Sequence, residues 1–135
     1  MEVKIESKIG RLSSDQYRIY EFLSDCANFQ QFATNEKVTN WQSDNDSCSF
    51  TVEGVGELFF RIVERQPDEL VKFSIENVQA ENIFLWVQLK SKSPGDTRIK
   101  LTLKLEANPV MSMFISKPMK NGLDKVVETL ENVCK

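Results

Sequence analysis

The sequence contains no histidine. Histidine is the side chain that most often transfers protons near neutral pH, and it is the commonest protein metal ligand. Its absence excludes Ser–His and Cys–His nucleophilic pairs and any His-ligated zinc site. No P-loop or dinucleotide fingerprint occurs either, because Gly54-Val55-Gly56 is too short for one and fits a hairpin turn. The sequence therefore presents no catalytic residue, no metal ligand set and no cofactor motif, which favours a protein without chemistry of its own.

Cysteine and long apolar runs are also scarce. The cysteines are Cys26, Cys48 and Cys134, an odd number at wide spacing, which predicts free thiols in a reducing compartment rather than a disulfide framework. The N-terminal residues alternate charged and apolar side chains, unlike the apolar segment of a signal peptide. The longest strongly apolar run, residues 83–87, is too short to cross a bilayer. We therefore expect a cytoplasmic protein without a transmembrane segment.

The charge is close to balanced. There are 17 basic and 20 acidic residues, so the formal net charge is only −3. Without a basic stripe, binding to nucleic acid is not expected. A chain of 135 residues that is 41% hydrophobic and 27% charged has the size and composition of one globular domain, which we place at residues 1–135.

Hydrophobic periodicity divides the chain into strands and helices. Val3, Ile5 and Ile9 alternate with charged residues, which predicts a half-buried strand that ends at Gly10. Ser13 and Gln16 have the spacing of a capping box at the start of a helix. Helical spacing follows up to Cys26, and a second short helix is expected near residues 29–33.

Residues 38–107 change to a period of two. They form about six alternating segments joined by short turns, which predicts antiparallel hairpins because a parallel crossover needs a longer connection. After Asn108, a good helix cap, and Pro109, a good first helical residue, apolar residues keep helical spacing to the end. Pro118 lies inside this segment and is expected to kink or split the helix.

The order of these elements resembles that of the START/Bet v 1-like (SRPBCC) superfamily over nearly the whole chain, in particular its small bacterial members. Residues 5–9 and 20–29 resemble the family's first strand and its F-L-x-D-x-x-x-F helix, and residues 47–56 resemble its next hairpin. Asn108-Pro109 before a Met- and Phe-rich helix is similar too. The resemblance implies an α+β helix-grip fold: a curved antiparallel sheet of about seven strands wrapped round a long C-terminal helix, with two short helices after the first strand.

Members of this superfamily bind lipids, sterols, hormones or polyketides, and the resemblance implies a cavity between sheet and helix. A small apolar ligand is therefore the expected function, either a lipid, a fatty acyl chain or an aromatic, polyketide-like molecule. The residues expected to line the cavity share the inner face of the strands or lie on the last helix: Phe50, Val52, Phe60, Phe73, Ile75, Leu85, Val87, Leu101, Met113, Phe114 and Met119. Apolar walls are typical of ligand pockets, but alternation alone predicts a filled core equally well.

Two other functions remain open. A polyketide cyclase-like enzyme could work by shaping its substrate, and Glu53 and Glu57, beside the glycine turn, are the carboxylates a bulge could re-aim inward. Phe59, Phe84 and Trp86 fall on the outer face of the strands, where grouped aromatic residues are typical of a protein-interaction surface, including a homodimer.

Overall fold

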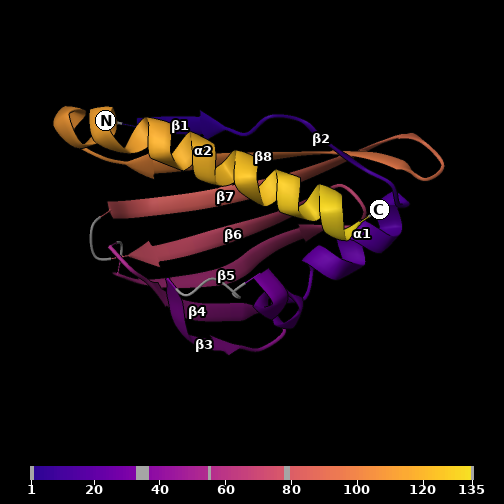
Figure 1. The fold of residues 1–135 in the computed structure, drawn as a ribbon, viewed down its shortest axis with the longest axis horizontal. Helices are drawn as coiled ribbons and strands as arrows, with labels where there is room; N and C mark the ends of the chain where they lie inside the picture. Colours follow the sequence, from indigo (N-terminus) through magenta and orange to yellow (C-terminus); the bar gives the residue numbers. More distant parts are fainter. Residues whose placement is uncertain (1, 33–36, 55, 78–79, 135) are drawn as a thin grey trace.

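The computed structural model describes residues 2–32, 37–54, 56–77 and 80–134. The chain forms an α+β fold in which an antiparallel sheet packs against one long helix (Figure 1). The elements are, in order, β1 (Glu2–Glu6), β2 (Gly10–Leu12), α1 (Gln16–Leu23), the 3-10 helix η1 (Cys26–Phe32), β3 (Val38–Ser43), β4 (Ser47–Val52), β5 (Gly56–Gln66), β6 (Leu70–Asn77), β7 (Ala80–Ser93), β8 (Asp96–Glu106) and α2 (Pro109–Val133). The predicted fold class is confirmed.

The sheet follows the order β1-β8-β7-β6-β5-β4-β3, and β2 also pairs with β8. Each adjacent pair is antiparallel, as the short turns predicted. β1 and β8 are the first and last strands of the chain, so their pairing brings the start of the chain beside the strand that leads into α2. We call the face of the sheet that packs against α2 the concave face, and the opposite face the convex face.

The first strand is interrupted, which the alternation did not predict. Glu6 pairs with Thr102 and Gly10 pairs with Ile99, so residues 7–9 lie opposite residues 100–101. The extra residue is a bulge and reverses the direction of the side chains that follow. Ile9, expected to be buried, is therefore 65% exposed, and Gly10 begins β2 instead of ending the strand.

The short helices close one end of the concave face. α1 buries Ile19, Tyr20 and Leu23. The expected capping box is wrong: Asp15 is the N-cap residue, no side chain caps this helix, and Gln16 is its first residue. At its other end, Arg65 Nη2 donates to the carbonyl oxygen of Ser24 at 2.9 Å. Arg65 of β5 thereby contacts the C-terminal end of α1, where the free carbonyl groups favour a cation.

The C-terminal helix is continuous. Asn108 Oδ1 accepts a hydrogen bond from the Met111 backbone at 2.7 Å, so the predicted cap is confirmed. Pro118 lies within α2 and does not split it, so a split at this residue is wrong, whereas a kink stays a prediction. α2 packs on β1, β2 and β8, diagonally across one part of the sheet (Figure 1). None of the helices in the part of the chain described is long and apolar enough to cross a membrane.

Candidate functional site

A row of aromatic rings crosses the concave face from β3 to η1. The ring centroids of Trp41 and Phe50 are 5.2 Å apart, and those of Phe50 and Phe60 are 5.5 Å apart. Both pairs are nearly parallel, with interplanar angles of 18° and 23°. Phe60 then meets the edge of Phe73 at 6.3 Å. These spacings are those at which aromatic rings attract one another.

Two rings from the helical segments extend this row. Phe29 of η1 lies 5.9 Å from Phe73, and Phe22 of α1 lies 6.4 Å from Phe29. We call the whole set the aromatic row: Phe22, Phe29, Trp41, Phe50, Phe60 and Phe73. Phe73 is buried, whereas the other five rings are half-buried. The row therefore presents apolar, flat surface that the described residues only partly cover.

A β-bulge turns Trp41 onto this face. Thr39 pairs with Thr51 and Gln42 with Ser49, so Asn40 and Trp41 both lie opposite Phe50. Asn40 takes the extra position with φ of 59°, a left-handed conformation that asparagine tolerates better than most residues. Without this bulge, strict alternation would place Asn40 opposite Phe50 and turn the indole of Trp41 to the convex face. Alternation along residues 38–43 therefore does not indicate that Trp41 faces inward.

The strand residues that were expected to line the cavity all lie on the concave face of the sheet. Phe50 and Val52 are half-buried on β4, and Phe60 and Leu85 are half-buried on β5 and β7. The others are buried, and they are Phe73, Ile75, Val87 and Leu101. The inner positions thus divide into a buried part on the central strands and a half-buried part toward β3 and β4.

The helix residues behave differently. Met119 is half-buried and packs against the apolar cluster near β1 and β8. Met113 is 81% exposed and Phe114 is 74% exposed, so neither lies in the interior, contrary to the expectation. The inward stripe of α2 runs through Met111, Ile115, Met119, Leu123 and Val127 at intervals of four. At about 100° per residue, Met113 lies about 160° round the helix from Ile115 and Phe114 about 100° from it, so both fall outside the stripe.

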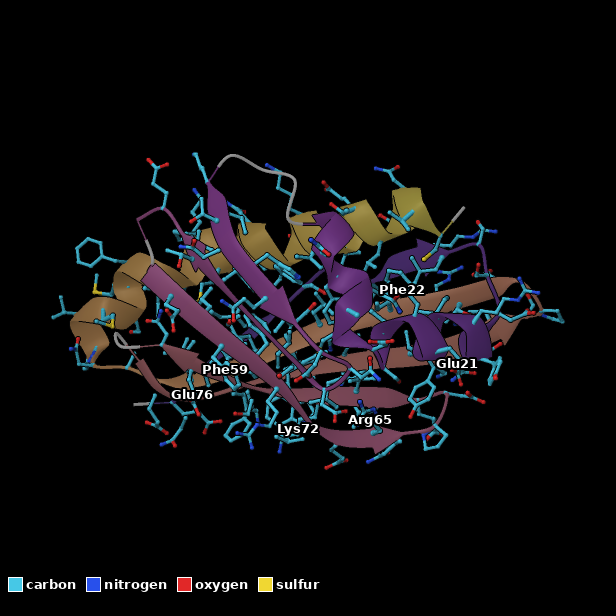
Figure 2. All side chains as sticks on the ribbon, turned by 90° about the horizontal axis from the view of Figure 1, so that it is seen from below. Glu21, Phe22, Phe59, Arg65, Lys72 and Glu76 are labelled. Atoms are coloured by element: carbon cyan, nitrogen blue, oxygen red, sulfur yellow. The ribbon has the colours of Figure 1, made fainter. Side chains whose placement is uncertain are left out.

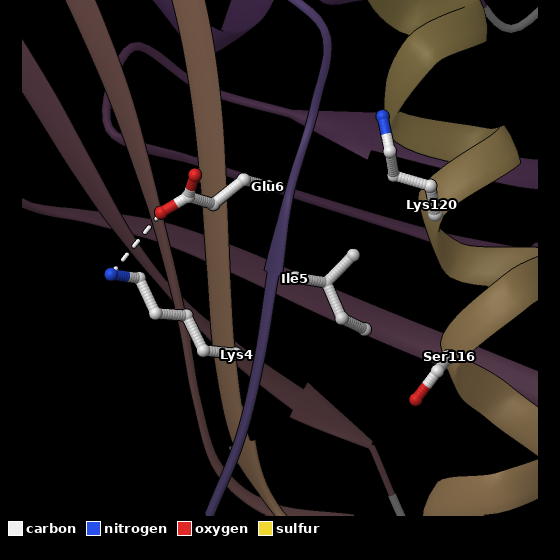
Figure 3. A pocket seen from close by; sticks show the side chains of 5 residues that line it. All are labelled: Lys4, Ile5, Glu6, Ser116 and Lys120. Atoms are coloured by element: carbon white, nitrogen blue, oxygen red, sulfur yellow. Dashed lines mark ion pairs between the residues drawn. The ribbon is translucent and has the colours of Figure 1, made fainter.

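A hollow of about 440 Å³ lies between β1 and α2. Ile5 points from β1 toward Ser116 on α2, whereas Lys4 and Glu6 leave β1 on the other side and pair at 3.1 Å (Figure 3). The fifth lining residue, Lys120, bonds Asp124 at 2.9 Å. Three of the five residues that line this hollow are charged, and none of the predicted site residues lines it. It is therefore a poorer place for an apolar molecule than the aromatic row.

Acids and metal ligands do not gather at the row. Glu53 and Glu57 are both exposed, so the bulge that could have re-aimed them inward does not do so. Across the described residues, no group of three Cys, Asp or Glu side chains is arranged to hold a metal ion. The row can bind and orient an apolar molecule, and its own rings supply no proton donor except the Trp41 indole, which bonds Ser43 Oγ at 3.2 Å.

Aromatic rings also lie on the convex face, where the alternation placed them. Figure 2 shows Phe59, Lys72 and Glu76 on the side of the sheet away from α2. Phe84 and Trp86 share that face, with ring centroids 6.1 Å apart, and Lys72 Nζ lies 4.7 Å and 5.0 Å from them. A lysine over the rings is attracted by their electron-rich faces and keeps this surface polar at its edge.

The arrangement of these elements matches solved structures throughout their length. A START superfamily protein from Mycobacterium smegmatis superposes with a TM-score of 0.76 at 13% identity, covering 98% of this chain and 96% of that one. Truncated norcoclaurine synthase from Thalictrum flavum gives 0.78 at 10% identity, covering 98% and 93%. The same synthase in complex with dopamine and hydroxybenzaldehyde gives 0.74 at 12% identity, covering 98% and 86%.

Sequence comparison adds no relative. No protein-family model matches the chain, and no curated protein is detectably similar to it. Identities of 10–13% over nearly complete chains show a shared fold and leave the function of each protein its own. The sheet order, the long closing helix and these superpositions agree: the chain has the START/Bet v 1-like helix-grip fold.

Proposed function

We propose that this protein binds a small apolar molecule, either aromatic or with an acyl chain, against the aromatic row. The observation that carries the proposal is the half-buried state of Trp41, Phe50 and Phe60 beside the filled core. Apolar surface removed from water contributes about 25 cal/mol per Å², so a ligand that covers these rings gains binding free energy. Stacking on rings that are already ordered adds about 0.5–1.5 kcal/mol for each aromatic contact.

The fold and its relatives support this proposal. Helix-grip proteins commonly hold hydrophobic ligands, and the norcoclaurine synthase structure contains two aromatic molecules, dopamine and hydroxybenzaldehyde. A cyclase-like enzyme is the alternative that this neighbour's name raises. The chain's lack of histidine and the exposure of Glu53 and Glu57 favour binding over catalysis. The proposal includes a cytoplasmic location, which cell fractionation tests.

The two tryptophans of the chain offer a direct test, because Trp41 lies in the aromatic row and Trp86 lies on the convex face. Single-tryptophan variants, Trp86→Phe and Trp41→Phe, would be titrated with anilinonaphthalene sulfonate and with palmitate. The emission of Trp41 should change on binding, and the emission of Trp86 should not. Native mass spectrometry should show one bound molecule per chain.

A matched pair of substitutions tests the location. Phe50→Ala removes a half-buried ring from the aromatic row, and Phe84→Ala removes a half-buried ring from the convex face. Loss of one stacked ring, about 1.4 kcal/mol, weakens binding about tenfold. We expect that loss for Phe50→Ala alone. Equal affinities in both variants, or no binding to the wild-type protein by any probe, would contradict the proposal.

A homodimer through Phe59, Phe84 and Trp86 is a second candidate. It is supported by the half-buried rings on a face that no other described element packs against. Lys72 and Lys104 stand over Phe84 and Trp86, and a dimer would have to cover or move them. Sedimentation equilibrium of wild-type protein and of Trp86→Ala tests this candidate. A wild-type monomer at high concentration would exclude it.

A further inference from the structure

β1 is an edge strand of the sheet, and alternate main-chain groups along it point away from β8. The bond of 2.8 Å from Ser7 N–H to the Leu101 carbonyl shows which residues of the register bond to β8. Bonded and non-bonded pairs alternate along an antiparallel ladder, so Ile5 bonds to β8 whereas the N–H and C=O groups of Lys4 and Glu6 point outward. Among the described residues, no strand pairs with β1 on this outer side. The outward groups can therefore pair with a further strand.

The helix α2 protects the next part of the same edge. Asp124 Oδ1 accepts a hydrogen bond from Lys8 N–H at 2.6 Å, and Glu131 Oε2 accepts one from Arg11 N–H at 3.0 Å. Carboxylates of α2 thereby cap two outward amides, and covering an edge with a helix is one way in which proteins prevent a strand from pairing. The N-terminal part of α2, residues 109–123, contains no acid. No carboxylate of that helix segment can therefore cap β1 in the same way.

The hollow of about 440 Å³ lies between β1 and α2, along this uncapped edge. Figure 3 shows Ile5 pointing toward Ser116, whereas the side chains of Lys4 and Glu6 leave β1 on the other side. The main chain of β1 thus borders the hollow, and Ser116 and Lys120 form the wall on α2. Pockets of about 300–1,000 Å³ hold whole drug-sized molecules, so this hollow has room for side chains of an added strand.

We propose that β1 and the hollow form a strand-addition site, where an extended peptide of another protein pairs antiparallel with β1. In this mode of recognition, main-chain bonds supply affinity and alternate side chains supply specificity. Peptide side chains opposite Glu6 and Lys4 lie on the convex face, where a base and an acid, respectively, complement the charges. The side chain between them lies opposite Ile5 and enters the hollow, which favours an apolar residue there. The partner segment therefore reads base, apolar, acid along its chain.

A second copy of this chain fits the strand but not the helix. Residues 4–6 read Lys-Ile-Glu, which is the same order of base, apolar and acid. Pairing of two β1 strands would place both α2 helices on the same side of the joined sheet, and each α2 packs on β1 and β2 at that edge. Neighbouring strands lie about 4.8 Å apart, whereas packed helices need about 8–10 Å. A peptide without such a helix is therefore the better occupant.

A synthetic peptide, Thr-Lys-Val-Glu-Thr with a fluorescein label, tests the site. We expect saturable binding in fluorescence anisotropy, and amide NMR should show slower hydrogen exchange at Lys4 and Glu6 when the peptide is bound. The peptide's glutamate N–H points to β1 and its valine N–H points away, so methylation of the two amides makes a matched pair. Methylation at glutamate should weaken binding about tenfold or more, and methylation at valine should leave it nearly unchanged. Equal effects, no binding, or unchanged exchange at Lys4 and Glu6 would overturn the proposal.

Variants of the protein test the register and the hollow. Lys4→Glu protein should bind the original peptide severalfold more weakly, and should prefer a peptide with lysine in place of glutamate. Ser116→Phe fills the hollow and should weaken binding, whereas Asn121→Phe adds the same ring at an exposed position of α2 and should not. Self-association that Lys4→Glu abolishes would identify a second copy as the occupant and refute the peptide. The proposal does not rest on a ligand at the aromatic row.

Discussion

Substitution of Gly10 by alanine tests how α2 sits on the sheet. Gly10 pairs with Ile99 at the start of β2 and is buried beneath the C-terminal half of α2. A Cβ atom built at this position would lie 2.3 Å from Val127 Cγ1 and 3.0 Å from Ile99 Cγ2. Both neighbours are fully buried, so neither can rotate into solvent. Gly10 is thus required by the close approach of the helix.

The magnitude follows from the overlap. Carbon atoms pack at about 3.5–4.0 Å, so Val127 or the helix that carries it must move by about 1 Å. Overpacking of a well-packed core costs about 1–3 kcal/mol. We expect a loss of about 2 kcal/mol, which lowers the midpoint of thermal unfolding by roughly 6–10 °C in a domain of this size. Circular dichroism melting and urea unfolding would measure both quantities.

Two companion variants decide whether the overlap is the cause. Gly122→Ala adds the same methyl group where no atom lies within 4 Å, inside α2, and should stabilise the protein by up to ~1 kcal/mol. Val127→Ala alone removes two buried methyl groups and costs about 2 kcal/mol. Combined with Gly10→Ala, it should cost less than the sum, because the clashing atom is gone. Additive losses, or a Gly10→Ala protein as stable as wild type, would refute the reasoning.

Substitutions at three other positions test individual polar contacts. Asn108→Ala removes the cap of α2 and should cost about 1 kcal/mol in urea unfolding, whereas Asn108→Asp should restore most of it. Arg65→Met breaks the bonds to Ser24 and Asp46 and should cost roughly 1 kcal/mol, so an unchanged midpoint would show that solvent already screens them. Asp124 accepts a hydrogen bond from the Lys8 backbone, and this bond and Lys120 lower the pKa of its carboxyl group. Its stabilising effect is therefore present above the usual aspartate pKa, about 4, and is lost as the pH falls through the lowered folded-state pKa. Asp124→Asn should flatten the acid side of the stability profile, and an unchanged profile would assign it to other carboxyl groups.

The sequence was sufficient for the order of the elements other than β2 and for the inner face of the central strands. Phe73, Ile75 and Val87 alternate without interruption, and each is buried as predicted. Alternation fails where one extra residue is inserted into a strand. A bulge after Glu6 exposes Ile9, and a bulge at Asn40 turns Trp41 inward. Alternation has a period of two, so a single extra residue reverses every later assignment until the next bulge.

The prediction for the first turns of α2 was wrong for a different reason. Val110, Met111, Met113, Phe114 and Ile115 spread apolar side chains over more than half of the helix circumference, so periodicity in these turns indicates no single narrow buried face. The pattern over the whole helix does indicate which face is buried. A stripe at intervals of four, from Met111 to Val127, passes through neither Met113 nor Phe114.

These features together explain why the aromatic row stays half-buried. A helix has one apolar stripe, and that of α2 packs on β1, β2 and β8, where Gly10 allows it to approach closely. The inner positions of β3 to β5 extend beyond that contact, and they include the rings of Trp41, Phe50 and Phe60. Rings stacked at 5.2 Å and 5.5 Å attract one another, and η1 packs against β3 and β4 beside them. The row is therefore ordered before any ligand arrives, and a ligand would gain contact area without the cost of ordering the surface that it binds.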